Sequence, residues 1–182
     1  MATLAEAEYT IDLLKMIEAE AETGGWDALP TLWAIELEEL APELGAFSCS
    51  PFPGYERLVQ VTGDPSEAMI HLGFLWQLTA LTDGPLPKFR NLVALILVNE
   101  GWRLVFTEGM PRSELPKDFS TNKDAVEQRI AVFCGLDGST TGVARTRGGK
   151  VEVMEGPING RFVDELKELL ETCVIAEMAR KD

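Results

Sequence analysis

The side chains that most often carry chemistry are sparse in this chain of 182 residues. His71 is the single histidine, and it follows Glu67 by four residues, so both would lie on one face of a helix. A zinc site needs three or four ligands, and no H-x-x-x-H or C-x-x-C spacing supplies them. We therefore interpret His71 as a partly buried structural histidine. Because it is the single histidine, chemistry that needs two histidines is excluded.

The three cysteines, Cys49, Cys134 and Cys173, lie far apart in the sequence. Their spacing is typical of reduced thiols and favours a cytoplasmic protein. Cys49 has no basic sequence neighbour that would lower its thiol pKa, so a nucleophilic role is disfavoured. Cys134 and Cys173 fall on apolar faces and should behave as small buried hydrophobes.

Two glycine-rich segments, 135–142 and 148–150, invite comparison with phosphate-binding loops. A P-loop requires G-x-x-x-x-G-K-[ST] ahead of a helix, whereas Val151 follows Lys150 here and begins a predicted strand. A dinucleotide-binding fingerprint is also missing from the sequence. We predict hairpin turns at both segments, and neither a cofactor nor a metal.

The net charge of −14 is concentrated near the N-terminus. Residues 1–50 hold 11 acidic side chains against one basic residue, Lys15. Such a field repels phosphates, so direct binding to nucleic acid is not expected. The acidic side chains either form a solvated face or meet a basic partner, for which the candidate residues are Glu36, Glu38 and Glu39.

The elements that must position these groups are organised around a central helix at residues 64–82. Asp64 is a suitable N-cap, Pro65 fits the first turn, and Gly84 with Pro85 ends the helix. The segment is too short and too polar to span a membrane. It is nevertheless apolar nearly all round, which requires burial on several sides or by a partner. We expect four of its side chains to be largely buried: Ile70, Leu72, Leu75 and Trp76.

Hydrophobic periodicity and turn residues predict the other elements. Before the central helix we expect an amphipathic helix over 4–21, a strand over 31–37, a loop over 48–54 and a strand over 58–61. After it we expect strands over 92–98 and 102–106 joined by a tight turn at 99–101. A hairpin of 128–134 and 140–147, a strand over 151–154 and a final helix follow. Asn159 should cap that helix, whose core stripe is Phe162, Leu166, Leu169, Leu170 and Cys173.

This order predicts a single α+β domain over residues 1–182. A mostly antiparallel sheet of five to seven strands would pack with an N-terminal, a central and a C-terminal helix. The order is similar to that of roadblock- or profilin-like domains, which are mostly binding scaffolds.

The predicted register of the last three strands follows from two-residue turns at 137–138 and 148–149. Arg145 would then lie opposite both Ile130 and Glu152, on the face away from Phe133. The face with Phe133 should pack on the C-terminal helix through Leu166 and Leu170 and include Ala131, Ala144, Val151 and Val153. The Arg145 face, basic and apolar, is a candidate partner surface.

The pattern EQRIAVFCGLDGSTTGVARTRG at 127–148, with a strand and a leucine-rich helix after it, resembles small uncharacterised proteins of actinobacteria and their phages. The Gly25-Trp26-Asp27 turn followed by LWAI adds to the likeness. The resemblance covers about half of the chain. It implies a cytoplasmic, phage-encoded protein and no assigned chemistry.

The long connection at 108–124 is the first candidate for a partner-binding segment, because loops of this length in compact domains tend to be functional or disordered. It combines apolar and basic side chains in an acidic protein: Met110, Arg112, Leu115, Lys117 and Phe119.

Three functions remain open. The first is a non-enzymatic, cytoplasmic protein-interaction module that binds a host protein, with a homodimer as a further alternative. The second is an acidic nucleic-acid mimic that binds a DNA-binding protein through residues 6–43. The third is a small-ligand-binding protein or enzyme with a pocket near His71.

Overall fold

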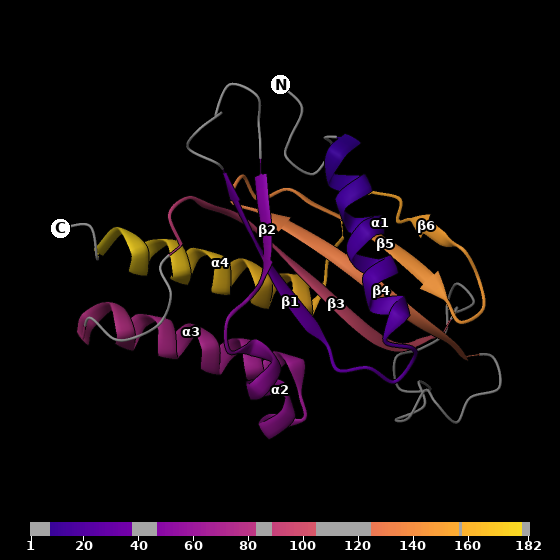
Figure 1. Cartoon of the computed structure of the whole chain (residues 1–182), viewed down its shortest axis with the longest axis horizontal. Coiled ribbons are helices and arrows are strands. Elements are labelled where there is room, and N and C mark those ends of the chain that lie inside the picture. The colour runs from indigo at the N-terminus through magenta and orange to yellow at the C-terminus, as the bar shows by residue number, and fades with distance from the viewer. Residues whose placement is uncertain (1–7, 38–46, 83–88, 105–124, 157, 180–182) are drawn as a thin grey trace, which may run out of the picture.

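The computed structural model describes residues 8–37, 47–82, 89–104, 125–156 and 158–179. These residues form an α+β fold in which one antiparallel sheet lies between helices (Figure 1). The sheet has six strands in the order β2-β1-β3-β4-β5-β6. Their bounds are Thr31–Leu37 (β1), Phe47–Pro51 (β2), Leu92–Leu104 (β3), Ala125–Gly135 (β4), Thr140–Thr146 (β5) and Val151–Val153 (β6).

Helices cover both faces of the sheet. The helix α1 (Glu8–Thr23) packs on β3, β4 and β5 through Leu14 and Ile17, against Ile96, Ala131 and Phe133. The opposite face, with Leu95, Leu97, Val132 and Cys134, packs in one core with α2 (Tyr55–Thr62), α3 (Pro65–Thr82) and α4 (Arg161–Ala179). The alternation of side chains along each strand thus separates two cores.

The central helix is confirmed at Pro65–Thr82. The backbone N–H groups of Ser66 and Glu67 donate to Asp64 Oδ1 over 2.7 and 3.3 Å, which is the predicted N-cap. Leu72 and Trp76 are buried as expected, but Ile70 and Leu75 are exposed. The prediction of their burial was wrong because α3 packs mainly on α2 and α4, which leaves one side of the helix in solvent.

Three local predictions between 48 and 106 were wrong. Residues 47–51 form the edge strand β2, where a loop was expected. Residues 55–62 form the helix α2, where a strand was expected over 58–61. The turn expected at 99–101 is absent from the described residues, because β3 runs unbroken to Leu104 and β4 pairs with it along that length. The final helix begins at Arg161, and four of its five predicted stripe residues are buried, while Phe162 packs partly buried against them.

The hairpin β4–β5 is confirmed, but its predicted register was wrong by one residue. Ile130 pairs with Ala144, and Arg129 pairs with Arg145. The loop holds three residues, Leu136–Gly138, with Gly138 at φ 79°, instead of two. Phe133 and Arg145 therefore lie on the same face, which packs on α1 and not on α4. The β5–β6 register is also shifted by one residue, because Arg145 pairs with Val151 and not with the predicted Glu152.

Candidate functional site

The outer side of α3 exposes a stripe of large apolar side chains. Ile70, Phe74 and Leu78 have exposed fractions of 56%, 66% and 48%. They follow one another at intervals of four residues, so they lie on one face of the helix. The helix has a single acidic residue, Glu67, and no lysine or arginine. This stripe is the solvent-facing side of the apolar run that the sequence shows.

The neighbouring helix α4 carries further exposed apolar residues near its C-terminal end. Ile175 and Met178 are 68% and 65% exposed. Thr172, which faces α3, precedes Ile175 by one helical turn, so Ile175 continues the same side of α4. Figure 1 shows α3 and α4 side by side and running in the same direction. We call the surface formed by Ile70, Phe74, Leu78, Ile175 and Met178 the α3–α4 face.

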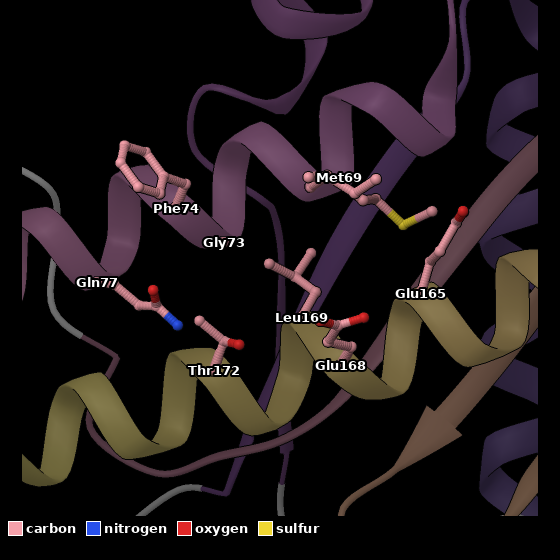
Figure 2. A pocket seen from close by; sticks show the side chains of 9 residues that line it. Met69, Gly73, Phe74, Gln77, Glu165, Glu168, Leu169 and Thr172 are labelled. Carbon is pink, nitrogen blue, oxygen red and sulfur yellow. The ribbon is translucent and has the colours of Figure 1, made fainter.

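A surface cavity of about 170 Å³ lies between the two helices on this face (Figure 2). Gly73 lies in its lining where any other residue would place a Cβ within 3.6 Å of Leu169 Cδ1 and 3.7 Å of Thr172 Cγ2. The glycine therefore leaves room that a methyl group would occupy. The α3 wall also holds Met69, Ile70, Phe74 and Gln77, and the α4 wall holds Glu165, Glu168, Leu169 and Thr172.

The α4 wall of the cavity is acidic. Glu168 is exposed, and the Glu165 side chain is 13% exposed. Glu165 Oε1 accepts a hydrogen bond from Arg161 Nε over 2.7 Å, whereas its buried Oε2 has no donor among the described residues. The cavity thus combines an apolar wall on α3 with an acidic wall on α4, an arrangement suited to binding an apolar group beside a cationic one.

His71 does not belong to this cavity. It is exposed on α3, so its interpretation as a partly buried residue was wrong. The cavity lies beside the central helix, where a pocket was predicted, but His71 is not among its lining residues. Within the described part of the chain, no group of three or more His, Cys, Asp or Glu residues could hold a metal ion.

The thiols are held in their protonated form. Cys134 and Cys173 are fully buried, as predicted, and Cys49 is partly buried on β2. Burial, and secondarily the charge of Glu20, raises the pKa of Cys49 to about 11. Burial is also the main cause that raises the pKa of Cys134 to about 11. A thiol with a raised pKa is a poor nucleophile, so these cysteines are not set up for covalent catalysis.

Most of the partner-binding residues predicted from the sequence lie outside the described residues: Met110, Arg112, Leu115, Lys117, Phe119, Glu38 and Glu39. Glu36 lies on β1, where its Oε1 accepts a hydrogen bond from the backbone N–H of Arg90 over 2.7 Å. Arg145 lies on β5, and its guanidinium binds the Glu18 carboxylate of α1. The structure therefore does not bring Glu36 and Arg145 together on one surface.

A buried ion cluster beneath α1 was not foreseen from the sequence. The Arg129 side chain is 1% exposed and binds Glu22 and Glu100 at 2.5 and 2.6 Å. Its NH2 group also donates to the Gly25 carbonyl oxygen, and its guanidinium lies 4.7 Å from the centroid of the Trp26 ring. Two acidic residues of α1, Glu18 and Glu22, are thus held by arginines of the sheet. The Glu18 carboxylate is fully buried in this cluster, whereas the Glu22 side chain is 39% exposed.

The comparisons with known proteins found no counterpart: no family model, curated protein or solved structure matches this chain. Among the residues that the structure describes, no helix is long and apolar enough to cross a membrane.

Proposed function

We propose that this protein is a cytoplasmic, non-enzymatic interaction module that binds another protein through the α3–α4 face. The observation that carries the proposal is the exposed stripe of Ile70, Phe74 and Leu78 on a helix with almost no charged residue. Clustered apolar side chains on the surface of a folded protein commonly mark interaction sites. The adjoining cavity adds the concave feature in which a partner's anchor side chain can be desolvated.

Photo-crosslinking in living cells tests this proposal. A photoreactive amino acid replaces Phe74 in one variant and Val153 in another. Val153 is a matched control because it is also apolar and 47% exposed, but lies on the edge strand β6. After irradiation, mass spectrometry identifies the proteins linked to each variant.

We expect position 74 to yield one predominant crosslinked protein that position 153 does not yield. The same protein should be lost when Ile70→Ser is added to the Phe74 variant, because Ile70 belongs to the same stripe. Equal products from both positions, or no product at position 74, would contradict an interaction through this face.

A further inference from the structure

The cavity on the α3–α4 face indicates what kind of partner it accepts. We propose that its occupant is a cationic amphipathic helix of another protein, which inserts one large apolar side chain above Gly73. This inference rests on the proposed function and specifies the partner for the same face.

The shape of the site supports a helix as the occupant. The cavity is lined on α3 from Met69 to Gln77 and on α4 from Glu165 to Thr172, so it follows the line between the two helices. An amphipathic helix can lay its apolar face into such a groove. The exposed residues of the α3 stripe, Ile70, Phe74 and Leu78, are spaced four residues apart, about one helical turn. Apolar side chains on successive turns of a helical partner could therefore contact them in order.

The size of the cavity supports a single apolar anchor. Its volume is about 170 Å³. An apolar protein cavity of about 150 Å³ accommodates a benzene molecule. A phenylalanine or leucine side chain therefore fits, and it would contact Gly73, Leu169 and Phe74.

The negative charge of α4 favours a cationic partner as the occupant and disfavours a second copy of this chain. The helix carries five acidic and two basic side chains, and Asp164, Glu168 and Glu171 are exposed. A second copy would bring the same acidic wall, within a chain of net charge −14, against itself. Lysines or arginines along one flank of a partner helix would instead lie over Glu168 while the apolar flank covers α3.

The test measures binding of synthetic peptides to the full chain by fluorescence anisotropy. The probe is a labelled peptide with leucines at i, i+3, i+4 and i+7 and lysines on one flank. One control peptide has the lysines replaced by glutamates, and a second has the same composition in scrambled order. The scrambled peptide corrects for the attraction of any cation to an acidic protein.

We expect only the ordered lysine peptide to bind, and Phe74→Ser to weaken it by about tenfold or more. Gly73→Ala should weaken binding without lowering the melting temperature, because the added methyl group makes ordinary contacts and alanine favours the helix. Glu168→Gln should reduce the salt dependence of binding. The matched controls Val153→Ser and Glu152→Gln, both exposed on β6, should bind as wild type does.

Three outcomes would overturn the inference. The first is equal binding of the ordered and scrambled peptides. The second is a Phe74→Ser or Gly73→Ala variant that binds as tightly as wild type. The third is a dimer, detected by sedimentation, that dissociates in Phe74→Ser, because it would assign the face to a second copy. If position 74 still crosslinks to a partner while the lysine peptide does not bind, the proposed function stands and only the cationic helix is rejected.

Discussion

The guanidinium of Arg145 binds both carboxylate oxygens of Glu18, with Nε–Oε1 and NH2–Oε2 distances of 2.8 and 2.7 Å. This bidentate pair joins β5 to α1 across 127 positions of sequence. The Glu18 side chain is 0% exposed, and its Oε1 also lies 3.5 Å from Arg129 NH1. The hydrogen bond to Glu18 is the main cause that raises the pKa of Arg145. The pair fixes α1 on one face of the sheet.

Glu18→Ala should strongly destabilise the protein. It leaves Arg145 and the buried Arg129 with less compensation for their charges, and breaking a buried ion pair typically costs about 3–5 kcal/mol. Urea denaturation followed by circular dichroism gives the free energy of unfolding. The control is Lys15→Ala on the same helix, where Lys15 and Asp12 are 3.8 Å apart and largely exposed. If both variants unfold at the same urea concentration, the buried pair contributes little to stability.

The parts of the fold that the sequence predicts well depend on local signals. The N-cap Asp64 and the following Pro65 define the start of α3 through contacts within one turn. The strands β4 and β5 were expected from apolar runs around a glycine turn, and both are present. Signals of this kind do not depend on how distant segments pack.

The errors arose where distant segments decide the outcome. The short run around Val59 was predicted as a strand, but Tyr55 and Val59, four residues apart, are both buried as one face of a helix. Gly63, at φ 70°, caps this helix by donating its N–H to the Val59 carbonyl. Residues 47–51 pair with β1 at the sheet edge, where Pro51 is tolerated because an edge strand has unpaired positions.

The candidate site was predictable only in outline. The even apolarity of α3 indicated burial by a partner, yet the sequence does not say which side α4 leaves uncovered. The single extra residue in the β4–β5 loop had a larger effect, because it turned Arg145 from a surface candidate into the ion partner of Glu18. The length of a hairpin turn and the side of a helix that its neighbour covers both depend on contacts between segments. The hydrophobic pattern along a single segment does not specify them.

Trp76→Ala should cost about 3–5 kcal/mol, the range for deleting a large buried aromatic side chain. Trp76 is 0% exposed, its ring is stacked on Phe89 with centroids 5.2 Å apart, and its Nε1 donates to Glu177 over 3.4 Å. Phe74→Ala, two positions away on the same helix but exposed, is the matched control and should change stability by less than about 0.5 kcal/mol. Thermal and urea unfolding of the two variants measure the difference. Stability equal to wild type in Trp76→Ala would show that this tryptophan is not part of the core.

Tyr55→Phe should be neutral or slightly stabilising. The Tyr55 side chain is 1% exposed, and its hydroxyl has no hydrogen-bond partner among the described residues. Burial, followed by the charges of Asp64 and Glu165, raises the pKa of this phenol. Removing a buried hydroxyl that lacks a partner should not lose a hydrogen bond. If urea denaturation shows that Tyr55→Phe lowers the free energy of unfolding by more than about 1.5 kcal/mol, the hydroxyl is hydrogen-bonded in solution.

Alkylation of the native protein should be slow and should rise with pH. The thiolate is the reactive form, and with a pKa of about 11 roughly one Cys49 thiol in a thousand is deprotonated at pH 8. The rate at Cys49 should therefore increase about tenfold per pH unit between pH 8 and 10, and Glu20→Gln should accelerate it by removing a negative charge. Buried Cys134 and Cys173 should react only after unfolding. Mass spectrometry after iodoacetamide treatment, with and without denaturant, counts the modified thiols. Rapid modification of Cys173 in the native protein would contradict the burial of α4 against the sheet.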